Sequence, residues 1–433
     1  MGETPLEYFA IVYTYLTMKN VETNKFCIGI ASEYNPFHNG HALHIERART
    51  HFGSGGAKIP VVAVLSSSFT QRGLPALADK WTRACMALAN GIDLVLELPF
   101  AYACNAGPEF ARGAVDVLAA TKFVTHLSFG MECLPEPQKT SFDIETILDI
   151  LIQEPPSFKS SLKKSLALGQ AYPKALASAL EDELPNAGTW ISSPNNMLAL
   201  CYLLRLRIKK YDLIPLPIQR EGSGYHDITD EPLASATAIR STFFKEGRWI
   251  EKAMPASSIS LLKEEQKRGR LCTGTEMLWS LLRSVLLRST PEDLRKYAGM
   301  DEGIENLFLK HYSAAMSYED FIGRCVCARY TRSRLQRQAA HLLVGLDRWT
   351  ALALKRNSPP YIRVLGCNER GRSLLRKRQI NTGDLPIITR LPAASGVVAQ
   401  TAAELEFRAS HLRELLLPCP DFEYEKKQKP SGL

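Results

Sequence analysis

The sequence predicts an α/β protein with a Rossmann-like, doubly wound parallel sheet, followed by a mainly helical C-terminal domain. Three observations support this prediction. Short apolar runs alternate with helical patterns up to about residue 250, strand patterns become rare beyond that point, and the chain has 433 residues. Because one hydrophobic core rarely grows beyond about 250–300 residues, this length favours two domains.

The expected strands are short apolar runs bounded by turn residues, as buried parallel strands are. They cover residues 27–31, 61–65, 94–98 and 126–129. Helical patterns lie between them at residues 41–51, 80–90 and 108–120, and Pro108 suits a first helical turn. This alternation predicts a doubly wound sheet, in which ligands bind at the carboxyl ends of the strands. We therefore expect functional residues in the loops after residues 31, 65, 98 and 129.

The rest of the chain completes a division into three parts. Residues 141–184 are helical and polar with prolines at 155, 156 and 173, which indicates a helical insertion. A helix at 194–209 and a strand at 213–218 then resume the sheet pattern, and one further short strand is expected at 361–365. We predict an accessory extension at residues 1–25, a sheet domain at 26–250, and a mainly helical domain at 251–433.

Composition excludes several classes of protein. No run of about 18 apolar residues exists, so no membrane span or membrane partner is expected. The first residues carry Glu3 and Glu7 and no basic segment, which is unlike a secretory signal, so a cytoplasmic location is expected. The ten cysteines form no CxxC pair, and we assign no metal to them.

Positive charge is concentrated in one segment. Residues 324–378 contain fourteen Arg or Lys against Asp347 and Glu369, a net charge of +12 in a chain whose total is +8. A solvated helix face usually mixes both signs, whereas this segment does not. The asymmetry indicates a polyanion partner, with nucleic acid favoured.

The most informative motif, EYNPFHNGH, runs from Glu33 to His41 and lies between the first expected strand and helix. Gly40 allows backbone to approach a phosphate closely, and a helix N-terminus offers unpaired N–H groups. His38 and His41 add two imidazoles at the same place. Donors aimed at the charge that develops on an α-phosphate are what nucleotidyl transfer needs, so we expect these two histidines to be catalytic.

The motif and further blocks resemble the tRNA(Met) cytidine acetate ligase family, within the HxGH nucleotidyltransferase superfamily. The similar blocks follow in order at residues 66–76, 79–84, 91–99, 129–130, 193–196, 219–220, 225–227 and 235–240, and more loosely at 331–337, 361–366 and 371–372. Three residues depart from the family pattern at loop edges: Ser67, Leu74 and Met131.

The resemblance implies a sheet domain of the HxGH type that binds ATP with Mg²⁺, activates acetate as acetyl-adenylate, and acetylates N4 of the wobble cytidine in the anticodon loop of elongator tRNA(Met). The expected catalytic residues are His38 and His41. The expected ATP-binding residues are Ala31, Ser32, Glu33, Tyr34, Asn35, Pro36, Phe37, His38, Asn39, Gly40, His41, Ala42, Leu43, His44, Gly130, Asn195, Arg220 and Arg240. The expected tRNA-binding residues are Arg332, Arg334, Arg337 and Arg372.

Positions in the expected elements agree with several of these assignments. Gly130 and Arg220 end two strands, where bare backbone and a bidentate phosphate clamp are useful. Asn195 at a helix start can contact a base edge or a ribose hydroxyl, and Arg240 is a second candidate for the triphosphate.

Alternatives remain at this point. An HxGH adenylyltransferase acting on a small phosphorylated metabolite would not need the basic segment, and an RNA-binding protein with a decayed nucleotide site would not need intact histidines. A class I aminoacyl-tRNA synthetase is disfavoured because residues 235–240 read SATAIR, without a KMSKS-type lysine pair.

Other candidate residues carry weaker predictions. Asp93 and Glu97 lie about 13 Å apart on an extended strand, too far for an acid–base pair, although Glu97 could assist Mg²⁺. Trp81 and the pair Phe243 and Phe244 are more typical of core than of base-stacking sites. Trp81 beside Lys80 and Arg83 leaves an RNA contact open.

Overall fold

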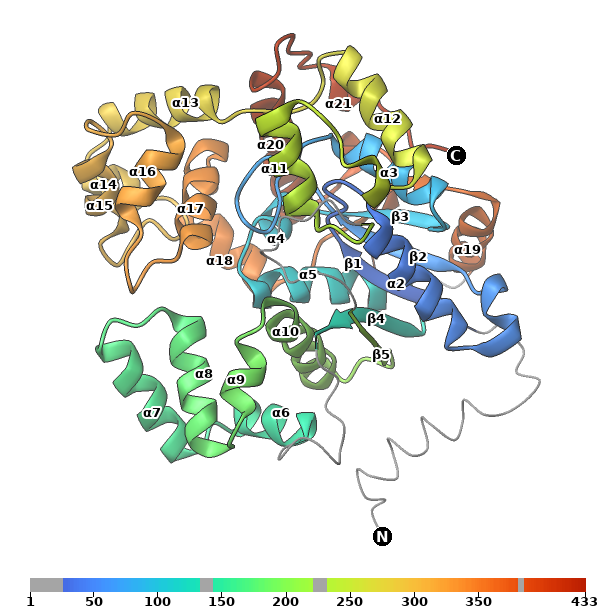
Figure 1. The fold of residues 1–433 in the computed structure, drawn as a ribbon, viewed down its shortest axis with the longest axis horizontal. Coiled ribbons are helices and arrows are strands. Elements are labelled where there is room, and N and C mark those ends of the chain that lie inside the picture. The colour runs from blue at the N-terminus through green and yellow to red at the C-terminus, as the bar shows by residue number, and fades with distance from the viewer. Residues whose placement is uncertain (1–25, 133–142, 221–231, 381–384) are drawn as a thin grey trace.

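The fold is centred on one mixed sheet, seen in a computed structural model that describes residues 26–132, 143–220, 232–380 and 385–433 (Figure 1). The expected extension at residues 1–25 and the block at 225–227 lie outside the described residues, as do the first two residues of the expected insertion. The described strands are β1 (Ile28–Ser32), β2 (Val61–Ser66), β3 (Leu94–Leu98), β4 (His126–Met131), β5 (Ile214–Gln219), β6 (Ile362–Cys367) and β7 (Ile387–Ile388).

The strand order confirms the doubly wound sheet. It is β5-β4-β1-β2-β3-β6-β7, and neighbouring strands are parallel except for the antiparallel pair β3 and β6. Chain order reverses at β1, which pairs with β2 on one side and β4 on the other. This switch point is where such sheets bind ligands. The strand expected near residue 361 exists, and it joins this same sheet from the C-terminal part of the chain.

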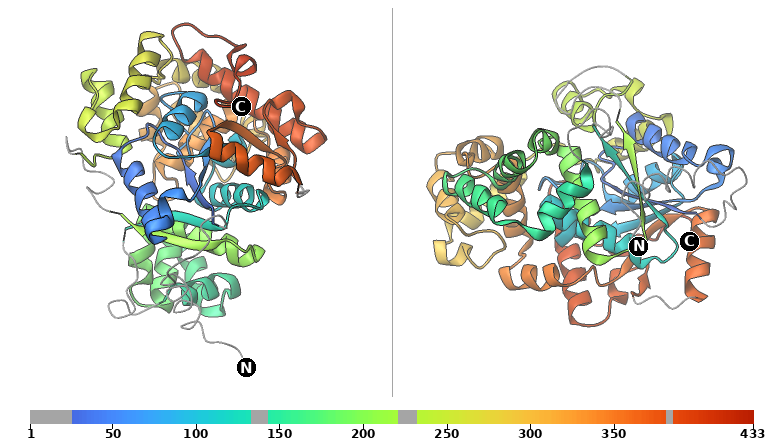
Figure 2. Two further views of the ribbon diagram at one scale, coloured as in Figure 1. Left: turned by 90° about the vertical axis from the view of Figure 1, so that its right-hand side faces the viewer. Right: turned by 90° about the horizontal axis from the view of Figure 1, so that it is seen from below.

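The helices agree with the expected pattern to within two residues where it was defined. Those of the N-terminal half are α2 (Asn39–Thr50), α3 (Lys80–Ala89), α4 (Phe100–Ala103), α5 (Gly107–Ala120), α6 (Ile144–Gln153), α7 (Pro156–Ala167), α8 (Tyr172–Glu183), α9 (Ala187–Ile191), α10 (Pro194–Lys209) and α11 (Ala236–Glu246). The prolines of the insertion mark helix starts: Pro156 opens α7 and Pro173 lies in the first turn of α8. Figure 2 (left) shows the insertion helices projecting below the sheet.

The C-terminal half is mainly helical, as expected. Its helices are α12 (Ala256–Lys267), α13 (Glu276–Leu287), α14 (Pro291–Leu294), α15 (Ile304–His311), α16 (Tyr318–Cys325), α17 (Arg332–Val344), α18 (Arg348–Arg356), α19 (Glu369–Ile380), α20 (Val397–Leu415) and α21 (Tyr424–Lys427). Helices α13 to α17 share an apolar cluster of their own, which includes Trp279, Phe308 and Phe321. The predicted boundary near residue 250 stays a prediction, while β6 and β7 tie later residues to the sheet.

Two apolar layers cover the two faces of the sheet. Along β2, Val61, Ala63 and Leu65 belong to one buried cluster, whereas Val62 and Val64 belong to the other. Because side chains alternate across a strand, each set packs against its own helices. The first cluster includes residues of α2, α3, α11 and α12, and the second includes residues of α5, α10 and α20.

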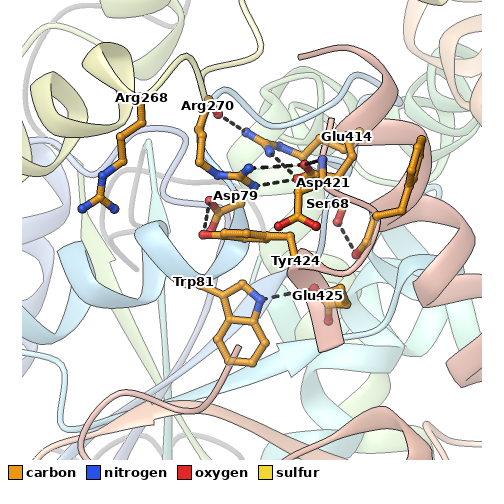
Figure 3. Close-up of polar contacts among 12 residues, drawn as sticks. Ser68, Asp79, Trp81, Arg268, Arg270, Glu414, Asp421, Tyr424 and Glu425 are labelled. Atoms are coloured by element: carbon orange, nitrogen blue, oxygen red, sulfur yellow. Dashed lines mark hydrogen bonds and ion pairs between the residues drawn. The ribbon is translucent and has the colours of Figure 1, made fainter. Parts of the chain in front are cut away.

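Hydrogen bonds from the C-terminal part of the chain hold the loop between β2 and α3 in place, and Figure 3 shows several of them. The Arg270 guanidinium donates to Glu414 at 2.7 Å and lies 3.5 Å from the centre of the Tyr424 ring. The Tyr424 hydroxyl donates in turn to Asp79, the N-cap of α3. Arg413 donates to the carbonyls of Ala76 and Leu77. The conformation of the loop therefore depends on residues more than 300 positions later in the chain.

A buried cluster of charges lies beneath this loop. The Lys80 ammonium contacts Glu97 at 2.5 Å, Glu406 at 2.8 Å and Glu425 at 2.9 Å, and Arg363 lies 2.7 Å from Glu425. Burial opposes the charge of Lys80, but the carboxylates raise its pKa above the ordinary value. These five side chains join α3, β3, β6, α20 and α21 in one network.

The cluster corrects two of the sequence-based expectations. Glu97 cannot assist Mg²⁺, because it is fully buried and paired with Lys80 and Arg363. Lys80, Trp81 and Arg83 cannot contact RNA, because all three are buried. The Arg83 guanidinium donates to the carbonyls of Ser67, Glu33 and Ala78 instead. Trp81 is core, as its pattern predicted, and it donates to Glu425 (Figure 3).

Candidate functional site

A pocket of about 670 Å³ lies at the carboxyl ends of β1, β4 and β5. Its lining includes residues after β1, the loop after β2, the end of β4, and the start of α11. Three of the four loops expected to carry function thus meet here. The loop after β3 contributes nothing to this lining, because it turns directly into α4, which is wholly buried.

The histidine motif forms the N-terminus of α2 within this pocket. His38 is the N-cap, and its Nδ1 accepts the backbone N–H of Gly40 at 3.1 Å. The backbone N–H of His38 donates to Nδ1 of His41 at 3.2 Å, and the two rings stack 3.7 Å apart. A Cβ on residue 40 would lie 2.9 Å from the His38 ring, so the glycine makes room for that ring.

These hydrogen bonds define the protonation of both rings. Since Nδ1 of each ring accepts a backbone N–H, the proton of the neutral ring must lie on Nε2. Burial lowers the pKa of His38 to about 3, and the charges of Arg220 and Arg240 act in the same direction. Burial also lowers the pKa of His41 well below its usual value, with His38 contributing next. Both rings therefore offer a neutral Nε2–H donor.

We expect ¹⁵N-histidine NMR spectra to show both rings as neutral Nε2–H tautomers from pH 8 down to about pH 5.5, because their pKa values lie below the ordinary 6.5 or so. In the unfolded chain the same rings take up protons near that ordinary value. The contribution of these neutral rings to the free energy of unfolding is therefore fully present above that ordinary pKa. It is lost progressively as the pH falls toward the folded-state pKa values. A half-protonated ring of His38 or His41 near pH 6.5 would contradict this assignment.

Four predicted ATP-binding residues outside the motif line the same pocket: Gly130, Asn195, Arg220 and Arg240. Arg220 follows β5, and a Cβ on Gly130 would lie 3.0 Å from its Cγ, so bare backbone at residue 130 lets the arginine chain pass. Arg240 also donates to the carbonyl of Asn35. Asn195 donates to Glu132 at 2.6 Å.

Most residues of the predicted ATP-binding stretch 31–44 line the pocket, and the others do not. Lining the pocket are Ala31, Ser32, Glu33, Tyr34, Asn35, His38, Gly40, His41, Leu43 and His44. Pro36, Phe37, Asn39 and Ala42 are not in the lining. Phe37 is fully buried, and Asn39 donates to the carbonyls of Pro232 and Lys252, which fixes the start of α2.

Several pocket residues were not found by sequence reasoning. Phe244 lines the pocket and is 49% exposed, so placing it in the core was wrong, whereas Phe243 is buried and stacks on Trp249. Ser128 on β4 is buried outside the lining and bonds to Nε2 of the lining residue His44 at 2.9 Å. With 3.6 residues per helical turn, Phe243 and Phe244 point about 100° apart on α11, so one ring can be buried while the other faces the pocket. Helical periodicity could therefore have distinguished the two residues.

The three departures from the family pattern have different surroundings. Leu74 lines the pocket. Ser67 and Met131 are fully buried, and the Met131 carbonyl accepts the backbone N–H of Arg220. Only Leu74 therefore contacts the space that a substrate would fill.

The expected tRNA-binding residues do not form one surface. Arg332, Arg334 and Arg337 lie on α17, but Arg372 lies on α19, on the opposite side of the molecule (Figure 1). Arg332 pairs with Glu319 at 2.6 Å, and Arg334 pairs with Glu302 at 3.0 Å. Arg337 is partly buried and donates to the Gln71 carbonyl.

The +12 segment has a smaller effective charge than its sequence indicates. Besides Arg332 and Arg334, four of its basic residues pair with carboxylates outside the segment: Arg324 with Asp320, Arg329 with Glu302, Lys355 with Glu109, and Arg363 with Glu97 and Glu425. Arg363 is also fully buried. The side chains of Lys377 and Arg378 lie outside the described residues. Helices long and apolar enough to cross a bilayer are absent from the described part of the chain.

Comparisons with known proteins show the family of this chain. The family model described as HIGH Nucleotidyl Transferase matches residues 26–429. A tRNA(Met) cytidine acetate ligase of Lysinibacillus sphaericus is 35% identical, over 85% of this chain and 90% of its own. Another from Acetivibrio thermocellus is 35% identical, over 91% and 96%.

Solved structures are similar over the same length. The apo structure of Thermotoga maritima TmcAL has a TM-score of 0.86 and 28% identity, covering 94% of this chain and 99% of the other. TmcAL bound with alpha-thio ATP has a TM-score of 0.81 and 29% identity, covering 93% and 97%.

Proposed function

Because the chain belongs to the tRNA(Met) cytidine acetate ligases, within the HIGH nucleotidyl transferases, we propose that it activates acetate with ATP and acetylates tRNA. The acceptor is N4 of the wobble cytidine of elongator tRNA(Met), and the reaction takes place in the cytoplasm. The observation that best supports the first step is the pair of neutral Nε2–H donors at a helix N-terminus in the switch-point pocket.

In the first step an acetate oxygen attacks the α-phosphorus of ATP, the bond from that phosphorus to the bridging oxygen breaks, and pyrophosphate leaves. No side chain attacks phosphorus, because acetate is the nucleophile. His38, His41 and the N-terminus of α2 stabilise the charge that develops on the α-phosphate. Arg220 and Arg240 bind the phosphates that leave.

In the second step the exocyclic amine of cytidine attacks the acetyl carbon of the adenylate. A carbon–nitrogen bond forms, the carbon–oxygen bond to AMP breaks, and the amine loses one proton. An unpaired anticodon base reaches a pocket at a small unstacking cost, which suits this chemistry.

Mg²⁺ fits the pocket as a companion of ATP. The described residues contain no cluster of three side chains that could hold a metal ion. Mg²⁺ commonly keeps several waters and binds through substrate phosphates with one or two carboxylates. Glu33 lines the pocket and would hold it, while its Oε1 accepts the Gln71 backbone N–H. When bound, the ion would neutralise charge on the leaving pyrophosphate.

Acetate-dependent ATP–pyrophosphate exchange without tRNA tests the first step. We expect exchange that requires acetate and survives without RNA. Exchange that ignores acetate, or that needs a phosphorylated metabolite instead, would contradict the proposal.

We expect Arg220→Ala to raise the KM for ATP about ten- to one-hundredfold, because one charge-assisted hydrogen bond contributes roughly 1.5–3 kcal/mol. Steady-state exchange measurements over a range of ATP concentrations check it. Arg248→Ala is the matched control, since Arg248 is exposed and lies outside the pocket lining. An unchanged KM for ATP with weaker tRNA binding would place Arg220 on an RNA surface.

A further inference from the structure

A second and larger cavity adjoins the ATP pocket. This groove has a volume of about 1810 Å³ and lies between α7–α10 on one side and α17–α18 on the other. The two helical groups form separate layers, α7–α9 below and α14–α17 above, in Figure 1. The groove and the ATP pocket share Gln71, Arg72, Pro194 and Leu198 in their linings. Anything bound in the groove therefore reaches the ATP pocket at these four residues.

The two walls of the groove differ in chemistry. The basic wall, defined as the lining residues of segments 71–112 and 298–355, contains eight Arg or Lys against Glu109 and Asp301. Four of the eight, Arg329, Arg332, Arg334 and Lys355, pair with carboxylates. The apolar wall, defined as the lining residues 151–204, contains Lys174 as its single basic residue, together with the carboxylates Glu154, Glu181 and Asp182. Most of the apolar wall consists of aliphatic and aromatic side chains, among them Phe158, Leu162, Met197 and Leu204.

Tyr172 is the exposed aromatic of the apolar wall. It begins α8, lines the groove, and is 53% exposed, whereas Phe158 in the same wall is buried. The backbone N–H of the preceding residue, Ala171, donates to the Ala328 carbonyl at 2.9 Å across to the other helical group. This bond links the start of α8, next to Tyr172, to the segment that precedes Arg329 of the basic wall.

We propose that the helical insertion is half of an RNA site: the groove receives an unpaired strand, with its phosphates on the basic wall and its bases on the apolar wall, where one base stacks on Tyr172. A duplex does not suit such a groove, because it carries phosphates along both outer edges and hides its bases. A single strand does, since positive charge tracks its backbone and aromatic rings stack its bases. Gln71 and Arg72 then mark where the acceptor base enters the ATP pocket.

This inference rests on the proposed tRNA substrate and adds a role for residues 143–191. Its test is the affinity of the full-length protein for a fluorescent anticodon stem-loop of elongator tRNA(Met), compared with a fully paired hairpin of equal length. We expect the stem-loop to bind more tightly. Tyr172→Ala should weaken its binding about tenfold, and Tyr172→Phe should bind as wild type because the ring remains.

Matched controls come from the same insertion. Leu168 is 73% exposed and outside the groove lining, so Leu168→Ala should bind RNA like wild type. On the basic wall, Arg348→Glu should weaken binding and lower the slope of log K against log salt by about one, whereas Lys164→Glu, outside the lining, should not. These side chains are exposed, so their replacement leaves the fold intact.

The outcomes separate this inference from the proposed function. Equal binding of stem-loop and paired hairpin, or wild-type affinity of Tyr172→Ala and Arg348→Glu, would overturn the groove assignment even if the wild-type protein acetylates tRNA. Failure of the wild-type protein to acetylate tRNA would instead contradict the proposed function, and the affinities would still show whether the groove binds RNA.

Discussion

Replacement of His41 by alanine is expected to lower acetate-dependent ATP–pyrophosphate exchange about 10²- to 10³-fold, the usual cost of removing one preorganised donor to a developing negative charge. The neutral ring of His41 offers Nε2–H, since its Nδ1 accepts the backbone N–H of His38. The loss should fall on kcat more than on KM, because the donor matters most when charge develops. Exchange assays at saturating ATP and acetate measure it.

Two further variants make this result specific. His51→Ala removes an exposed histidine at the end of the same helix and should retain wild-type exchange. His41→Gln keeps an N–H donor at a similar reach and should retain more exchange than His41→Ala. Near wild-type exchange in His41→Ala would remove this histidine from the catalytic assignment.

Replacement of Lys80 by methionine is expected to lower the free energy of unfolding by about 3–5 kcal/mol, because it leaves buried carboxylates without their partner. Glu97, Glu406 and Glu425 would then face Arg363 alone. Burial and the neighbouring Glu97 already raise the pKa of Glu406 above its ordinary value, so this site tolerates little more negative charge. Denaturant unfolding measures the change.

An exposed ion pair from the same region is the control. Lys263 on α12 pairs with Glu251 at 2.6 Å, and the two side chains are 49% and 58% exposed. Lys263→Ala should cost less than about 1 kcal/mol, as exposed pairs do. Equal stability losses in the two variants would contradict a structural role for the buried cluster.

The sheet and the pocket could be predicted because both leave local patterns. Buried parallel strands are short apolar runs, and their carboxyl ends meet at one edge, so the motif after β1 and the strand ends at Gly130 and Arg220 had to converge. The strand β6, which lies between β3 and β7, had the same local pattern. Its antiparallel pairing with β3 joins residues more than 260 positions apart, and no local pattern encodes that.

The accessibility of individual charges could not be predicted from the sequence, because the partners of the ion pairs lie far apart in the chain. Arg363 was counted as part of a basic surface, yet Glu97 and Glu425 neutralise it in the interior. Glu97 was expected to be able to assist Mg²⁺, but it forms a buried ion pair with Lys80. Charge counts report composition, whereas burial decides which charges a partner can reach.

The insertion shows a different limit. Its polar helical pattern predicted a helical insertion without a function, and Tyr172 carried no motif that would single it out. Only the packing of α8 opposite α17 and α18 gives that ring a basic wall to face. The proposed RNA site requires both the basic wall and the apolar wall, so the sequence of neither wall predicts it alone.

The central claim is acetyl transfer to cytidine, and one measurement tests it most directly. Purified protein is incubated with ATP, Mg²⁺, acetate labelled with ¹³C at both carbons, and unmodified elongator tRNA(Met), and the digested nucleosides are weighed by mass spectrometry. The account predicts a cytidine heavier by one acetyl group that carries both heavy carbons, located at the wobble position and absent when ATP is omitted or when His41→Ala replaces the wild-type protein. Unmodified cytidine in the complete reaction, alongside active acetate-dependent exchange, would contradict it.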